Sequence, residues 1–176
     1  MVTTSRLARG LRHLLHVDAR VRRAFPRATL ARIEAAVRAS EARHRAELRF
    51  VVEGALEPWA ILRGLTPRER AVELFSALRV WDTAHNNGVL IYVQVVDRDI
   101  EIVADRGLNA CVAADEWDAV CRAMEDAFRR RDYARGAEEG IAAVTAILER
   151  HFPPVDGDAD ELPNAPVLLC SVTREP

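Results

Sequence analysis

Residues 88–104 read GVLIYVQVVDRDIEIVA, and this stretch sets the architecture expected for the whole chain. Residues 89–96 are the most apolar run in the sequence, which is typical of a central strand buried on both faces. The polar residues 97–99 favour a tight turn, and residues 100–104 alternate in the manner of a further strand. The stretch therefore predicts a β-hairpin whose first strand lies inside the sheet.

The segment before the hairpin predicts a first strand over residues 47–56 and a connecting helix. That helix begins at Thr66-Pro67-Arg68-Glu69, a capping box with proline at the first helical position, and runs to Arg79. A right-handed crossover makes the strands on either side of it parallel. Further upstream we expect a helix over residues 5–16, a linker over 18–26 and a helix that is capped by Thr29 and ends around residues 43–46. A loop is expected over residues 54–64, between the first strand and the connecting helix.

Two helices are expected after the hairpin. Asp115 is a candidate cap for the first, whose apolar face lies within residues 117–128. The second covers residues 133–150 and ends before Pro153-Pro154. Residues 167–172 fit either a short strand or an interface. Together these elements predict a three-layer α/β/α sandwich with a small mixed sheet that contains a β-hairpin.

Composition excludes several classes of protein. The net charge of −2 argues against a general nucleic-acid binder. All 25 basic residues are arginine, which excludes a Schiff-base or P-loop lysine. The sparse cysteines Cys111, Cys121 and Cys170 fit neither a disulfide framework nor a zinc site, so a reducing, cytoplasmic location is expected. No signal peptide and no membrane span are expected either.

The catalytic motifs of familiar enzymes are missing or weak. Asp97-Arg98-Asp99 after an apolar strand resembles the nucleophile motif of haloacid dehalogenase phosphatases, but the sequence continues directly as a strand, which favours a hairpin turn. His13 and His16 can share a helix face, but a metal site needs a third ligand, and we expect them at the surface. No G-x-S-x-G elbow is present.

Acidic and amide side chains are expected at one edge of the sheet. If the second and third strands are antiparallel, the start of one lies beside the end of the other, and this brings together Asp82, Asn87, Asp105 and Asp115, with Asn86 nearby. Hard cations take oxygen ligands from such loops, so Ca²⁺ or Mg²⁺ is the expected cofactor. The alternative is purely local: Asp115 caps a helix, Asn87 belongs to a turn and Asp82 is solvated.

The N-terminal helix has a short leucine stripe, made of Leu7, Leu11 and Leu14, with arginines around it. Such a helix can pack on the body of its own protein, lie on a membrane surface or bind a partner protein. The stripe is short and contains no Trp or Phe, which favours packing on the body.

Several segments agree in order with one known family. These are Asn87-Gly88-Val89-Leu90-Ile91, Asp97-Arg98, Ile100-Glu101-Ile102 and Asp105-Arg106-Gly107-Leu108, then Phe128-Arg129 and Tyr133-Ala134-Arg135-Gly136. Here the chain resembles the TPM domain family, known from thylakoid-lumen proteins of photosystem II repair and from bacterial proteins. The resemblance divides the chain into an amphipathic helix and linker (1–27), a TPM-like α/β domain (28–152) and an acidic, proline-bearing tail (153–176). It implies a divalent-cation site and, for some members, an acid phosphatase activity.

Three functions follow from these observations. The first is a binding or regulatory module with a divalent-cation site built from loops. The second is a metal-assisted phosphatase, in which the cation polarises a phosphoryl oxygen. The third is an interaction domain that uses the basic N-terminal helix or the segment after Val167 to contact a partner protein. Whether the chain is an enzyme is left open by the sequence, and so is its oligomeric state.

Overall fold

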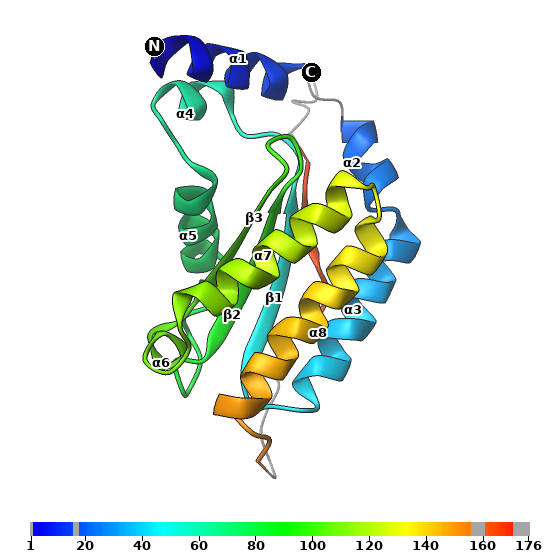
Figure 1. Ribbon diagram of the computed structural model, residues 1–176, viewed down its shortest axis with the longest axis vertical. Helices are drawn as coiled ribbons and strands as arrows, with labels where there is room; N and C mark the ends of the chain where they lie inside the picture. Colours follow the sequence, from blue (N-terminus) through cyan, green and yellow to red (C-terminus); the bar gives the residue numbers. More distant parts are fainter. Residues whose placement is uncertain (1, 16–17, 156–160, 171–176) are drawn as a thin grey trace.

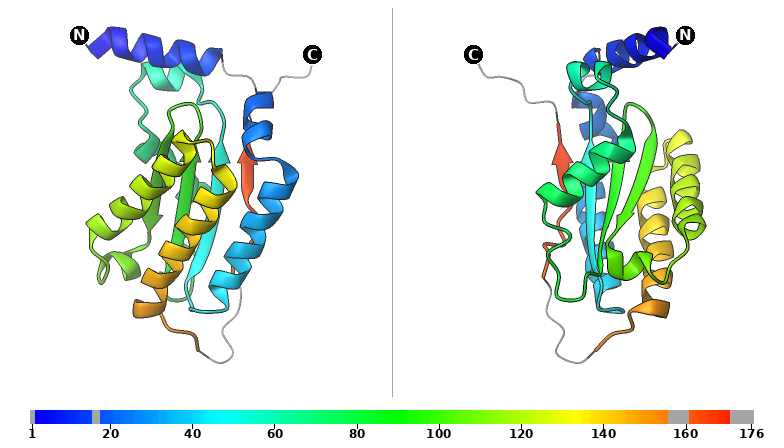
Figure 2. Two further views of the ribbon diagram at one scale, coloured as in Figure 1. Left: turned by 45° about the vertical axis from the view of Figure 1, so that its right-hand side comes forward. Right: turned by 90° about the vertical axis from the view of Figure 1, so that its left-hand side faces the viewer.

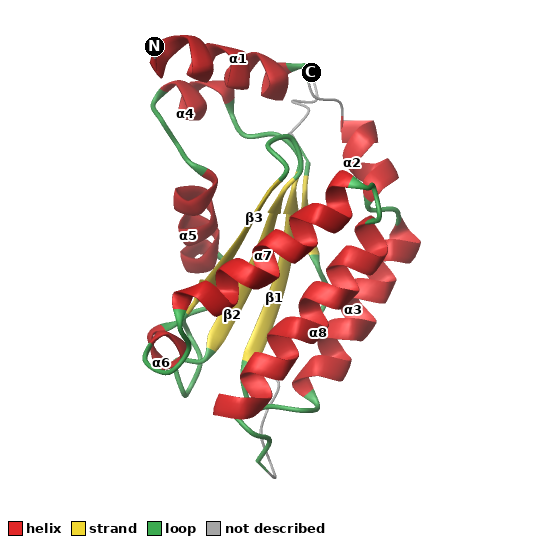
Figure 3. Cartoon of the chain, viewed as in Figure 1, coloured by secondary structure: helices red, strands yellow, loops and turns green. Residues whose placement is uncertain are grey.

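The computed structural model describes residues 2–15, 18–155 and 161–170, which form a four-stranded sheet with helices on both faces (Figure 1, Figure 3). The strands are β1 (Glu47–Glu53), β2 (Gly88–Gln94), β3 (Asp99–Ala104) and β4 (Val167–Leu169), in the order β3-β2-β1-β4. The helices are α1 (Val2–Leu14), α2 (Asp18–Ala24), α3 (Arg27–Glu41), α4 (Pro58–Leu62), α5 (Pro67–Ala77), α6 (Arg106–Asn109), α7 (Ala114–Arg129) and α8 (Tyr133–His151). The expected α/β/α sandwich is confirmed.

The sheet is mixed and separates two hydrophobic cores. β1 runs parallel to β2 and β4, and β3 runs antiparallel to β2. The larger core lies between the sheet and helices α3, α7 and α8, whereas α5 covers the other face (Figure 2). Every residue of β1 and β2 is buried, as the apolar run in the sequence predicts.

The alternation of side chains along β2 explains both cores. Val89, Ile91 and Val93 belong to the larger core, and Leu90 and Tyr92 to the core under α5. Successive side chains of a strand point to opposite faces, so an apolar run without polar interruption covers both faces at once.

The hairpin and the crossover take the predicted form. Val89 pairs with Ala104, so the start of β2 lies beside the end of β3. The capping box at Thr66 is present: its hydroxyl accepts a hydrogen bond from the backbone of Glu69, and the Glu69 carboxylate accepts one from the backbone of Thr66. The helix that begins there connects the parallel strands β1 and β2.

Two segments predicted to be irregular contain short helices. α2 replaces the linker at 18–26 and is held by Val21 and Phe25, which are buried four residues apart. α4 lies within the predicted loop and is held by Ile61, with Pro58 at its first turn. One or two buried side chains anchor each helix. So few apolar positions do not form a repeat from which a helix could be recognised in the sequence.

The predicted helix caps at Thr29 and Asp115 are wrong. Thr29 lies inside α3 and is buried, because the helix begins two residues earlier, directly after Pro26. Asp115 lies in the first turn of α7, whose N-cap is Ala113. Both residue types are common caps, but the backbone enters the helix before reaching them.

Helix α1 packs on the body, as its sequence favoured, but it does so with its polar side. It crosses α4 at one end of the molecule (Figure 1, Figure 2). His13 is buried, whereas Leu7, Leu11 and Leu14 are 57%, 55% and 67% exposed. The surface position predicted for His13 is therefore wrong, and His16 lies outside the described residues. The leucine stripe faces solvent because the opposite side of the helix meets a buried carboxylate.

Candidate functional site

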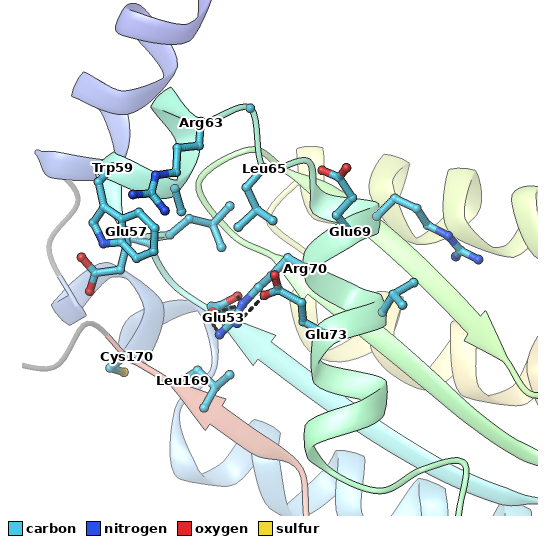
Figure 4. A pocket seen from close by; sticks show the side chains of 16 residues that line it. Glu53, Glu57, Trp59, Arg63, Leu65, Glu69, Arg70, Glu73, Leu169 and Cys170 are labelled. Carbon is cyan, nitrogen blue, oxygen red and sulfur yellow. Dashed lines mark hydrogen bonds and ion pairs between the residues drawn. The ribbon is translucent and has the colours of Figure 1, made fainter.

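A pocket of about 920 Å³ opens beside the carboxyl ends of β1 and β4 (Figure 4). Its walls come from the segment after β1, from α4, from the first turns of α5 and from the end of β4. Ligands of open α/β sheets bind outside the carboxyl ends of the strands. The position of this pocket in the fold therefore makes it a candidate binding site.

A buried ion pair lies among the residues that line this pocket (Figure 4). Arg70 of α5 donates three hydrogen bonds to Glu53 of β1, among them Nη2 to Oε1 at 2.8 Å and Nε to Oε2 at 3.0 Å. Tyr92 of β2 donates its hydroxyl to Glu53 Oε2 at 2.6 Å. Burial and the nearby carboxylate raise the pKa of Tyr92, so its phenol stays protonated. Both oxygens of Glu53 accept hydrogen bonds, which leaves neither free to take a proton from a substrate.

The outer part of the pocket combines apolar side chains with charged side chains of both signs, and its exposed carboxylates are those of Glu57, Glu69 and Glu73. Trp59 is 56% exposed, and the Arg63 guanidinium lies 4.8 Å from the centroid of its ring. Leu65 and the half-exposed Val72 extend the apolar surface toward α5. Among the residues that the structure describes, Arg63 has no ion-pair partner. This arrangement can hold an aromatic group beside Trp59 and an anionic group beside Arg63.

Asp97 lies in the turn between β2 and β3 and anchors α1. Arg9 contacts Asp97 Oδ2 at 2.6 Å, and His13 Nε2 lies 3.2 Å from the same oxygen. Burial alone would raise the pKa of Asp97, but the side chains of His13 and Arg9 outweigh it and lower that pKa to about 2. The Asp97-Arg98-Asp99 stretch therefore belongs to a β-hairpin, as the strand pattern indicated, but the turn covers residues 95–98 and Asp99 is already the first residue of β3.

Two of the predicted cation ligands lie at the expected edge of the sheet. The Asp105 backbone N–H donates to the carbonyl of Gly88 at 2.9 Å, and Asp105 caps α6, with Oδ1 accepting from the Arg106 backbone at 2.7 Å. Asn87 is fully buried and donates its amide to the carbonyl of Arg45. Asp105 Oδ2 and Asn87 Oδ1 are both buried without a hydrogen-bond partner in the described part of the chain.

The other two predicted ligands are placed differently. Asp82 pairs with Arg79 at 2.5 Å on the surface, and Asp115 is exposed in the first turn of α7. Within residues 2–15, 18–155 and 161–170, no three His, Cys, Asp or Glu side chains form a group that could hold a metal ion. A cation at this edge would therefore depend on Asp105, on amide oxygens and on backbone carbonyls.

The buried network of Glu53, Arg70 and Tyr92 was missed from the sequence. A partial signal exists, because Glu53 directly follows the apolar residues 50–52 and Tyr92 stands inside the apolar run of β2. A buried charge in such a strand needs a partner of opposite charge. The sequence does not say which arginine supplies it, since the rotation of α5 on the sheet decides that.

Cys111, Cys121 and Cys170 form no disulfide. None of the helices in the described residues has the length and apolar character that crossing a bilayer requires.

One family model and several solved structures are similar to this chain. The family model of the TPM domain matches residues 22–147. The BA42 protein of the psychrophilic bacterium Bizionia argentinensis has a solved structure that is similar at a TM-score of 0.70 and 31% identity, covering 80% of this chain and 92% of that one. An N-terminal domain from P. gingivalis is similar in fold at a TM-score of 0.51 and 21% identity, covering 69% of this chain and 76% of that one.

The N-terminal domain of the cg2496 protein from Corynebacterium glutamicum shares the fold at a TM-score of 0.51 and 14% identity, covering 80% of this chain and 78% of that one. No curated protein matches the chain. The family model spans most of the sequence, and the relative from Bizionia argentinensis is aligned over nearly its whole length. The chain therefore belongs to the TPM domain family.

Proposed function

We propose that this TPM domain is a binding module, which holds a ligand in the pocket beside β1 and β4, rather than a hydrolase. The observation that carries the proposal is the state of Glu53. It is the buried carboxylate of the pocket, and its two oxygens are occupied by Arg70 and Tyr92. A general base needs an oxygen within reach of the proton that it removes, and Glu53 offers none. The network instead gives the pocket a rigid inner wall.

The ligand that fits best has an aromatic or aliphatic body and an anionic end. The exposed ring of Trp59 offers a stacking surface, and Arg63 beside it offers a cation without an ion-pair partner in the described residues. Pockets of this kind take most of their affinity from apolar contact and their orientation from a few polar groups.

The pocket can be tested with an aromatic sulfonate, 1-anilinonaphthalene-8-sulfonate, monitored by its fluorescence. We expect Trp59→Ala and Arg63→Gln each to weaken binding about tenfold, as the loss of one stacking or charge-assisted contact implies. Trp81→Phe is the matched control, because Trp81 is also exposed but does not line the pocket. Equal binding by all variants, or hydrolysis of an aryl phosphate that Glu53→Gln abolishes, would remove the proposal.

A divalent-cation site at the start of β2 is the second candidate function. It is favoured by the two buried oxygens, Asp105 Oδ2 and Asn87 Oδ1, that have no partner in the described residues. Unsatisfied buried oxygens are costly, and a cation would satisfy them. The nearby Arg106 guanidinium, which donates to Asn86 Oδ1 at 2.6 Å, opposes a second positive charge. We therefore expect weak binding.

Millimolar Ca²⁺ or Mg²⁺ should raise the melting temperature of the full chain by a few degrees, because a ligand that binds only the native state stabilises it. Asp105→Asn should abolish most of that rise without removing the cap of α6, since asparagine caps helices as well as aspartate. Asp115→Asn, which changes an exposed carboxylate, is the control. Identical melting curves with cation and with chelator would leave Asp105 as a helix cap only.

A further inference from the structure

A second groove, of about 930 Å³, lies at the same end of the sheet as the β2–β3 turn but away from α4 and α5. Its walls are the end of α1, helix α2, the turn between β2 and β3, and the connection between α7 and α8, which Figure 1 and Figure 2 show near one another. Its charged lining consists of five arginines: Arg12, Arg20, Arg23, Arg98 and Arg131. No acidic side chain is among the described residues that line it.

Within the described residues, one of these five guanidinium groups, that of Arg12, has an ion-pair partner. Arg12 lies 3.7 Å from Asp97 Oδ1, but Asp97 is already held by Arg9 at 2.6 Å. The other four arginines of the groove have no ion-pair partner in the part of the chain that the structure describes. Guanidinium groups that line one groove repel one another, and an anion that enters the groove relieves this repulsion.

Two of the five arginines occupy backbone positions that favour glycine. Arg98 has φ 57° in the β2–β3 turn, and Arg131 has φ 64° directly after α7. Around Arg131 the N–H of Asp132 donates to the carbonyl of Ala127 at 3.1 Å, the bond of a helix end that usually carries glycine. A side chain in the left-handed region is unfavourable, and here two such side chains line one groove.

We propose that the arginine groove binds an anion that carries two or more phosphate groups. Arginine presents a planar set of donors that matches phosphate oxygens, and a single phosphate would leave most of the five guanidinium charges unbalanced. The chain as a whole has a net charge of −2, so the positive region is local. A compact anion therefore fits better than a long polyanion, and the site is separate from the pocket beside β1 and β4.

The phosphate groups can come from a soluble molecule or from a lipid headgroup. The exposed Leu11 and Leu14 of α1 lie in the same helix as Arg12, so a headgroup in the groove would bring these leucines to the lipid surface. The chemistry at the groove is the same in both cases, and the experiment separates the two sources.

The full chain should bind inorganic tripolyphosphate in a calorimetric titration. We expect Arg98→Gly and Arg131→Gly each to weaken binding about tenfold and the double variant about a hundredfold, because each removes a charge-assisted contact. Raising the salt concentration from about 0.05 M to about 0.5 M should weaken the binding of tripolyphosphate by the wild type and by each variant that still binds it. Both single variants should keep or raise the melting temperature, since glycine suits these backbone positions. Loss of binding then cannot be assigned to unfolding.

Arg79→Gly is the matched control. Arg79 has φ 56° at the end of α5, where the N–H of Val80 donates to the carbonyl of Phe75 at 3.0 Å, and it does not line the groove. This variant changes the charge and the backbone preference in the same way, but it should bind tripolyphosphate as the wild type does. A loss equal to that of Arg131→Gly would show a general charge effect and overturn the proposal.

Sedimentation with phosphatidylcholine vesicles, with and without phosphatidylinositol bisphosphate, forms the second arm. Binding only to vesicles with the bisphosphate, weakened by Arg98→Gly and Arg131→Gly, identifies the source as a lipid. Binding to tripolyphosphate with the same dependence identifies a soluble source. The proposal is overturned if neither ligand binds, or if Leu11→Ser with Leu14→Ser abolishes vesicle binding that the arginine variants retain.

Discussion

Arg70→Met is expected to lower the free energy of unfolding by about 3–5 kcal/mol, because it leaves a buried carboxylate without its cation. The Glu53 side chain is 8% exposed and accepts three hydrogen bonds from Arg70, the shortest at 2.8 Å. Tyr92 would be its one remaining side-chain donor among the contacts described, and a neutral hydroxyl does not replace a guanidinium. Denaturant unfolding of the full chain measures the loss directly, and the melting temperature should fall by roughly 6–20 °C.

Two variants separate this buried pair from an ordinary surface contact. Glu53→Gln combined with Arg70→Met should be more stable than Arg70→Met alone, because the buried charge is gone. Arg38→Ala removes an exposed pair with Glu34, with side chains 69% and 39% exposed, and should cost less than about 0.5 kcal/mol. If Arg70→Met proves no more costly than Arg38→Ala, the network does not support the wall of the pocket.

Gly88→Ala should destabilise the protein by about 3 kcal/mol or more, because an added methyl group has no room at the start of β2. A Cβ at this position would overlap the backbone carbonyl oxygen of Val80. Val80 is fully buried, and Gly88 pairs with Glu47 and accepts a hydrogen bond from Asp105. The obstacle is backbone, which cannot turn aside as a flexible side chain does.

The same measurement on Gly10→Ala provides the contrast. Gly10 lies inside α1, and a Cβ there meets nothing within 4 Å. Alanine favours a helix over glycine by about 1 kcal/mol, so this variant should be neutral or slightly more stable. Equal unfolding curves for Gly88→Ala and the wild type would mean that the loop before β2 can move away. The edge of the sheet that holds Asn87 and Asp105 would then be able to shift and make room for an added methyl group.

A helix or strand could be predicted from the sequence when neighbouring residues stabilise it, and it was missed when contacts with distant residues do so. The hairpin was predicted correctly because burial on two faces leaves an apolar run in 89–96 and alternation in 100–104. The capping box at Thr66 is equally local, since two residues three positions apart satisfy each other. Helices α2 and α4 were missed because a few residues that contact distant parts of the chain hold each one in place.

The candidate sites also divide into positions that strand directions predict and positions that tertiary contacts determine. The strand directions placed Asp105 beside Asn87 at the start of β2, and the hydrogen bond from the Asp105 backbone to Gly88 shows that Asp105 lies at that edge. They did not place Asp82 or Asp115, because loop and helix-end side chains are free to turn outward, and Asp82 instead pairs with Arg79. Whether a cation binds at this edge stays a prediction.

Local patterns were enough to predict the α/β/α class, the parallel crossover, the hairpin and the family, since each depends on a few neighbouring residues or on segments in a set order. The packing of the folded chain was needed to show which side of α1 faces the body, which arginine meets Glu53 and which five arginines share a groove. These contacts join residues far apart in the chain. The rotation of each helix on the sheet determines them, and that rotation is a compromise among all the packed side chains at once.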